Sequence, residues 1–142
     1  MRKIFLMLLL LTSLACTTSI DVEKENEKAI RKLFESFNQH NWQAMADCYE
    51  DTAAFLDPSF GVESVRLTKA DIVKKYEDME NQIPDIRDSV LTIMANEDQV
   101  WVEFISKGKI NDSIQLYVPI ATHFTLKNGK VIKDNTYYSA CD

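Results

Sequence analysis

The stretch Gln115–Tyr138, QLYVPIATHFTLKNGKVIKDNTYY, decides the fold class because it predicts two long strands joined by a minimal turn. Asn128 and Gly129 stand between the strands, and both residue types tolerate the positive φ that a two-residue hairpin turn requires. Every second side chain from Leu116 to Leu126 is apolar, except Thr122. Such alternation is typical of a strand with one buried face. The segment therefore predicts an antiparallel hairpin, with strands over Gln115–Leu126 and Lys130–Tyr138 and with Thr122 pointing inward.

Three segments upstream have the residue spacing of helices. In the first, Val22–Gln39, apolar side chains recur every three to four residues and charged side chains fill the opposite face. Asn41 is a suitable N-cap for a short second helix, whose inward residues are Trp42, Met45, Ala46 and Tyr49. Thr68 and Asp71 predict a capping box for a third helix, which must end before Pro84.

Further strands are predicted at Ala53–Asp57, Ser89–Met94 and Val100–Lys107. Helices followed by neighbouring strands favour an α+β fold over a parallel sheet. In the third of these strands Val102 and Phe104 belong to the apolar face, which turns Trp101 to the other side. Pro58 forces an extended conformation on Asp57, which shares the face of Phe55. The orientation of the last strand, with Asp134, Thr136 and Tyr138 on one face, is ambiguous from the pattern alone.

The first sixteen residues, MRKIFLMLLLLTSLAC, predict export from the cytoplasm. A charged start precedes an apolar run too short to span a bilayer, and small residues lead to Cys16. The segment resembles a bacterial lipoprotein signal, which implies cleavage after residue 15, lipidation of Cys16 and sorting to the outer membrane, since Thr17 follows the cysteine. An ordinary secretory signal with a chance cysteine is the alternative. We expect a signal peptide over residues 1–15, a tether over 16–21 and one domain over 22–142.

The charge of the predicted mature chain excludes some partner classes. Residues 1–15 hold two of the 16 basic residues and none of the 22 acidic ones, so their removal leaves 127 residues with a formal charge of −8. Such a surface argues against binding to nucleic acid or to anionic lipid head groups. Cys48 and Cys141 are free to form a disulfide in an oxidising envelope, although Cys48 also fits a buried helix position. We expect no metal site and no cofactor, because the two histidines are isolated and no zinc-ligand spacing occurs.

Six segments together resemble the nuclear-transport-factor-two-like superfamily, which includes SnoaL-like polyketide cyclases and ketosteroid isomerases. They are AIRKLFESFNQHN (29–41), WQAMADCYED (42–51), AAFLDPSFG (53–61), TKADIVKKY (68–76), PIATHFTLKNGKV (119–131) and VIKDNTYY (131–138). The resemblance implies a cone in which a bent, mostly antiparallel sheet wraps around the long N-terminal helix, with two shorter helices and an apolar cavity open at one end. Fold alone is a weak guide to activity, because many functions share one fold.

The resemblance also implies site residues. Asp57, followed by Pro58, matches the general base of ketosteroid isomerases, and burial in an apolar mouth would raise its pKa. The alternative is that Asp57 only closes the strand and starts a turn. The isomerase oxyanion donors fall at Leu33 and at Ala121 or Thr122, none of which is an acidic hydrogen-bond donor, so steroid isomerisation is not expected.

Asp134 matches the acid/base aspartate of SnoaL-like cyclases, with Tyr138 on the same face as a second proton-handling group. Its polar neighbours Lys133 and Asn135 favour instead a solvated charge just past the hairpin. Scytalone dehydratase relatives need paired cavity histidines, and limonene epoxide hydrolase relatives need an arginine on the sheet. His40 and His123 do not form such a pair, and no arginine follows Arg87, so both subfamilies are set aside.

Two functions remain. The preferred one is an envelope lipoprotein that binds a small apolar or aromatic molecule in a cavity lined by Phe55, Val102, Phe104, Thr122, Phe124 and Thr136. The alternative is a cyclase- or isomerase-type enzyme with Asp57 as general base, assisted by Asp134 or Tyr138. The opposite face of the sheet carries Trp101, Ile105, His123 and Tyr137, an aromatic patch that predicts a homodimer.

Overall fold

The computed structural model describes residues 21–139. The predicted leader, the lipidation site Cys16 and Cys141 lie outside the described residues. Cys48 is buried. No helix in residues 21–139 is long and apolar enough to cross a membrane.

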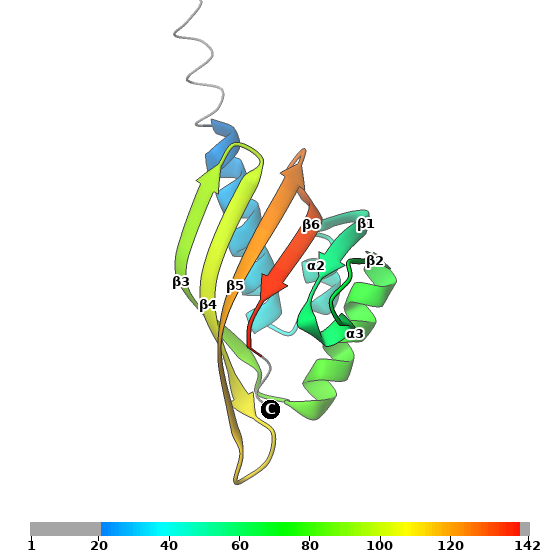
Figure 1. Ribbon diagram of the computed structural model, residues 1–142, viewed down its shortest axis with the longest axis vertical. Coiled ribbons are helices and arrows are strands. Elements are labelled where there is room, and N and C mark those ends of the chain that lie inside the picture. Colours follow the sequence, from blue (N-terminus) through cyan, green and yellow to red (C-terminus); the bar gives the residue numbers. More distant parts are fainter. Residues whose placement is uncertain (1–20, 140–142) are drawn as a thin grey trace, which may run out of the picture.

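The fold is a mixed α+β arrangement built on a six-stranded sheet (Figure 1). The strands are β1 (Tyr49–Leu56), β2 (Val65–Thr68), β3 (Arg87–Asn96), β4 (Gln99–Lys109), β5 (Gln115–Lys127) and β6 (Lys130–Tyr137). Their order in the sheet is β2-β1-β6-β5-β4-β3, and every neighbouring pair is antiparallel except β1 and β6. Sequence patterning did not predict β2, which is a short edge strand with no fully buried side chain.

Helical structure covers residues 21–38, α2 (Trp42–Ala46) and α3 (Lys69–Gln82) within the described part of the chain. Both predicted caps are present: the Asn41 side chain accepts a hydrogen bond from the Ala44 backbone, and Thr68 and Asp71 form a complete capping box. The prediction that Tyr49 belongs to the second helix is wrong, because α2 ends after one turn and Tyr49 starts β1.

The core lies between the helix of residues 21–38 and one face of the sheet (Figure 1). Phe34 on this helix makes edge-to-face contacts with Phe104 on β4 and Phe124 on β5, at ring-centroid distances of 4.9 and 6.4 Å. Helices α2 and α3 lie beside β1 and β2 at the other side of the molecule. Side chains do not fill all of the space between the helices and the sheet. The remaining space is a cavity lined by residues of the helices and of the strands β1, β3, β4, β5 and β6.

A bulge in β6 sets the direction of the residues that follow the hairpin turn. Asn128 and Gly129 have positive φ, at 51° and 72°, as the turn requires. Leu126 then pairs with Val131, but Thr125 pairs with Lys133, so Ile132 has no partner on β5. Because one residue is skipped, Val131 and Asp134 both face the core although they are three positions apart. The bulge therefore aims Asp134 inward.

Candidate functional site

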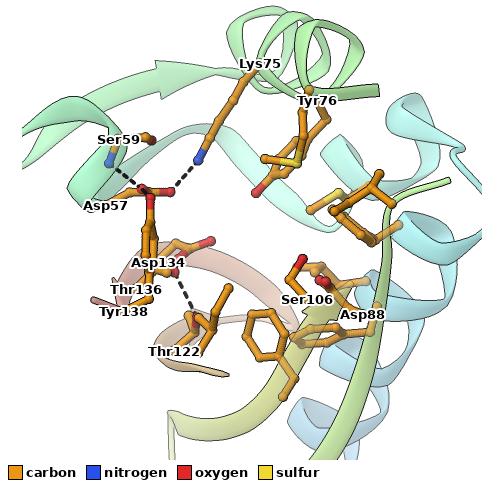
Figure 2. A pocket seen from close by; sticks show the side chains of 18 of the residues that line it. Asp57, Ser59, Lys75, Tyr76, Asp88, Ser106, Thr122, Asp134, Thr136 and Tyr138 are labelled. Atoms are coloured by element: carbon orange, nitrogen blue, oxygen red, sulfur yellow. Dashed lines mark hydrogen bonds and ion pairs between the residues drawn. The ribbon is translucent and has the colours of Figure 1, made fainter. Parts of the chain in front are cut away.

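A cavity of about 230 Å³ lies between the helices and the inner face of the sheet (Figure 2). Most of its wall is aliphatic or aromatic. The apolar lining consists of Leu33, Phe34, Phe37, Met45, Tyr49, Tyr76, Met79, Ile83, Ile86, Phe104, Leu116, Val118, Ile120, Phe124 and Tyr138. The polar lining consists of Asp57, Ser59, Lys75, Asp88, Ser106, Thr122, Asp134 and Thr136. A mostly apolar cavity with a few convergent polar groups is the usual form of a small-molecule site.

Asp57 lies at the end of β1 and caps the short 3₁₀ helix Pro58–Phe60. Its Oδ1 accepts hydrogen bonds from the Ser59 backbone N–H at 2.8 Å and from the Tyr138 hydroxyl at 3.1 Å. Its Oδ2 forms an ion pair with the Lys75 ammonium (Figure 2). Both oxygens are therefore satisfied, and the carboxylate has the turn-capping role that the sequence offered as the alternative to catalysis.

The predicted rise in the pKa of Asp57 is wrong. Burial does raise the pKa of this carboxyl group, but the charge of Lys75, its hydrogen bond and the backbone N–H of Ser59 outweigh that effect and leave the pKa below its ordinary value. The ion pair is only 13% exposed on the lysine side and 11% on the aspartate side. Asp57 is thus held as an anion of low basicity, which makes it a weak acceptor for a substrate proton near neutral pH.

Sequence reasoning missed Lys75, although a signal was present. On α3 the inward residues Ile72 and Met79 lie three positions before and four after Lys75, so all three belong to one helix face. The ammonium also lies 4.9 Å from the centre of the Phe60 ring, a cation–π distance. A lysine on the apolar face of a helix requires a buried partner, and Asp57 is that partner.

Asp134 is buried, with 5% of its surface exposed, and the interpretation of this residue as a solvated charge is wrong. Its Oδ2 accepts a hydrogen bond from the Tyr49 hydroxyl at 2.8 Å, and its Oδ1 accepts one from the Thr136 hydroxyl at 2.9 Å. Thr136 is in turn 2.8 Å from the Thr122 hydroxyl (Figure 2). Burial raises the pKa of Asp134, and these hydrogen bonds together with the charge of Lys75 only partly offset that rise.

The other candidates from the sequence divide between cavity and core. Thr122, Thr136, Tyr138, Phe104 and Phe124 line the cavity. Phe55 and Val102 are not part of the lining, which corrects the expectation for both. Phe55 is 1% exposed because its ring stacks on Tyr49, and Val102 has no exposed surface within the core.

Asp88 and Ser106 form a third polar group, on the side of the cavity away from Asp57 and Tyr138 (Figure 2). Burial raises the pKa of Asp88 to about 7, and the Ser106 hydroxyl opposes that rise. Sequence reasoning missed this pair. The signal was the position of Asp88 on the same alternating face as Ile86 and Val90, which both pack in the core.

Both histidines lie outside the cavity lining. His123 is on the outer face of the sheet, where its ring stacks on Trp101 with 4.2 Å between centroids, as its alternation with Thr122 predicted. His40 follows the helix of residues 21–38 and contacts the Glu80 carboxylate and the Ile86 carbonyl oxygen. Residues 21–139 contain no group of three or more side chains placed to hold a metal ion.

A sequence model of the SnoaL-like domain matches residues 30–133. This chain belongs to the SnoaL-like domain family. The match spans the cavity walls from the helix of residues 21–38 through Asp57, Lys75 and Asp88 to the bulge of β6. No curated protein matches the sequence.

Solved structures with the same fold come from several bacteria. A hypothetical protein with a ketosteroid isomerase-like fold from Catenulispora acidiphila, in complex with trimethylamine, matches with a TM-score of 0.70 at 18% identity over 78% of this chain and 85% of its own. A putative SnoaL-like polyketide cyclase from Jannaschia sp. CCS1 matches with a TM-score of 0.72 at 16% identity over 83% and 88%. An LEH-like epoxide hydrolase from M. tuberculosis matches with a TM-score of 0.70 at 12% identity over 82% and 84%. At such identities the similarity establishes the fold alone.

Within this SnoaL-like domain, the positions that resemble the isomerase oxyanion donors do not supply one. Leu33 lines the cavity and has no polar group. Thr122 also lines it, but its hydroxyl is hydrogen-bonded to Thr136 in the network around Asp134. The polar groups of this cavity therefore form three separate clusters, around Asp57, Asp134 and Asp88.

Proposed function

We propose that this SnoaL-like domain binds a small apolar or aromatic molecule, and that a lipidated Cys16 holds it at the cell envelope. The observation that carries the binding function is the cavity of about 230 Å³ with its mostly apolar wall. For comparison, an apolar cavity of about 150 Å³ is large enough to bind benzene. A ligand with one aromatic ring and a short substituent matches this size.

The state of Asp57 favours binding over proton transfer at this position. Lys75, Ser59 and Tyr138 already donate hydrogen bonds to the two carboxylate oxygens, so a substrate proton would compete with three established donors. The same contacts give this side of the cavity a fixed polar edge. Such an edge orients a ligand without reacting with it.

Recovery of the bound molecule tests the binding function. The protein would be purified from its native membrane, extracted with solvent and examined by mass spectrometry for small molecules that copurify. In Ile120→Trp a large ring enters the cavity, so we expect the copurified molecule to be lost. Tyr117→Trp is the matched control, because Tyr117 is on the same strand but 62% exposed. Equal recovery from both variants would exclude the cavity as the binding site.

The alternative function is a cyclase- or isomerase-type reaction, and one observation favours it. Asp134 is a buried carboxyl group with a raised pKa, next to the Tyr49 hydroxyl, and this combination suits a group that exchanges protons with a substrate. In this reading Asp134 replaces Asp57 as the general base, with Tyr138 remaining at the cavity edge.

Deuterium exchange separates the two functions once the ligand is known. A carbonyl ligand incubated with the protein in D₂O would gain deuterium next to the carbonyl if Asp134 acts as a base. Asp134→Asn should then abolish exchange while ligand binding persists. A ligand recovered without deuterium would leave binding as the function.

The envelope location rests on the leader sequence and has its own test. Cys16→Ala should release the protein from the membrane fraction, and the outer-membrane fraction should contain the wild type. A Cys16→Ala protein that remains membrane-bound would exclude lipid anchoring at Cys16.

We also propose that two copies associate through the outer face of the sheet. The patch of Trp101, Ile105, His123 and Tyr137 faces away from the cavity, and Trp101 and Tyr137 are 43% and 47% exposed. Burying these rings against a second copy would remove apolar surface from water.

A further inference from the structure

Within residues 21–139, one carboxyl group of the cavity has neither an ion pair nor a hydrogen bond on each oxygen. Three carboxyl groups and one ammonium group line the cavity: Asp57, Asp88, Asp134 and Lys75. Asp57 takes the lysine as its partner. Asp134 receives hydrogen bonds on both oxygens, from Tyr49 and from Thr136. Asp88 is the remaining carboxyl group, and the cavity lining within the described part of the chain holds no second ammonium or guanidinium group to pair with it.

The position of Asp88 is fixed by its backbone. The Asn38 side chain donates a hydrogen bond to the Asp88 carbonyl oxygen at 2.9 Å and accepts one from the Asp88 N–H at 2.8 Å. The backbone of Asp88 is therefore anchored to the helix of residues 21–38. The Oδ1 of its side chain is buried and has no hydrogen-bond partner within residues 21–139. Buried polar atoms are rarely left unpaired, because each unpaired atom costs free energy.

The residues around Asp88 indicate which kind of ligand would complement the cavity. Asp88 and Ser106 lie across the open middle of the cavity from Asp57 and Tyr138 (Figure 2). Most of the cavity wall is apolar and includes the rings of Phe34 and Phe104, which contact each other. A complementary molecule has an apolar body for this middle region and a positively charged hydrogen-bond donor at one end.

We propose that the ligand is a small amphiphilic amine, whose ammonium group binds the Asp88 carboxylate beside Ser106 while its hydrocarbon part fills the cavity. The inference rests on the proposed binding function and specifies its ligand class. An ammonium group supplies both the missing charge and the missing donor, whereas an alcohol supplies only the donor. An anionic ligand would bring a negative charge next to the Asp88 carboxyl group and would supply no hydrogen-bond donor.

The test compares two probes of the same shape, 2-phenylethylamine and propylbenzene, which differ by an ammonium group in place of a methyl group. Their affinities would be measured by NMR titration on the wild type, Asp88→Asn and Asp112→Asn. Asp112 is exposed and outside the cavity lining, so its variant controls for the loss of one negative charge. We expect the wild type and Asp112→Asn to bind the amine at least tenfold more tightly than propylbenzene.

In Asp88→Asn the affinity for the amine should fall at least tenfold, and that for propylbenzene should change less than twofold. Wild-type binding of propylbenzene as tightly as the amine would overturn the ligand class alone and leave the binding function intact. An amine preference that survives in Asp88→Asn would also overturn the inference. Binding of neither probe would count against the proposed cavity function, and the inference would fall with it.

Discussion

Replacement of Asp88 by asparagine should stabilise the protein at pH 8 but not at pH 4, because the stability of the wild type should fall between these pH values. A carboxyl group whose pKa is higher in the folded state holds its proton more tightly there than in the unfolded chain. The pKa of Asp88 rises from its ordinary value of 3.8 to about 7 because the group is buried. Stability is therefore lost as pH rises from about 4 to about 7, and the full loss persists above pH 7.

The size of this loss follows from the two pKa values. The difference between 3.8 and about 7, at about 1.4 kcal/mol per pH unit, corresponds to about 4 kcal/mol. Asparagine has nearly the same shape and does not ionise. Its amide group introduces a pH-independent cost of about 1–3 kcal/mol if a buried N–H finds no partner. The pH dependence isolates the ionisation of Asp88, because the fixed cost is the same at every pH.

Urea unfolding of the wild type and Asp88→Asn at pH 4 and pH 8 measures both quantities. The variant should be equal to or less stable than the wild type at pH 4. The free energy of unfolding of the variant minus that of the wild type should be about 4 kcal/mol higher at pH 8 than at pH 4. A stability difference that is the same at both pH values would show that Asp88 ionises normally, and the argument from its burial would be wrong.

Three further perturbations test the rest of the site and the outer face. Lys75→Met leaves the Asp57 carboxylate buried without its ion pair, so the free energy of unfolding at pH 7 should fall by about 3 kcal/mol. The double variant with Asp57→Asn should regain most of this loss. A loss below about 0.5 kcal/mol in Lys75→Met would contradict the pairing. Tyr49→Phe removes one hydrogen bond to Asp134, so the pKa of Asp134 should rise further. Carbon NMR of the Asp134 carboxyl group measures this pKa, and an unchanged titration would exclude the contact. Trp101→Ser should shift the mature, unlipidated protein from dimer to monomer in sedimentation experiments at micromolar concentration. A wild-type protein that sediments as a monomer would exclude this interface.

The three carboxyl groups of the cavity illustrate how one fold sets different proton affinities. Asp57 is paired with an ammonium group and its pKa is lowered. Asp134 has hydrogen bonds but no counter-charge in contact, and its pKa is raised. Asp88 has an unpaired oxygen, and its pKa reaches about 7. The environment of each group, rather than its residue type, decides its proton affinity.

Local rules allowed much of the fold to be predicted from the sequence. Asn128 and Gly129 specify the hairpin through their tolerance of positive φ, and Thr68 with Asp71 specifies the start of α3 through backbone capping. The alternation along β5 placed Thr122 inward correctly. These features depend on residues within a few positions of one another, and a sequence displays such neighbours directly.

The electrostatics of the site were decided by tertiary structure. Asp134 faces the cavity only because Ile132 bulges out of β6, and the alternation of the sequence does not show where a bulge occurs. Asp57 has a lowered pKa because Lys75, eighteen residues away on a helix, reaches its carboxylate. Asp88 has a raised pKa because packing removes its carboxyl group from water. Desolvation and pairing depend on which distant side chains share a space, so the sequence determined the elements and the three-dimensional packing determined their chemistry.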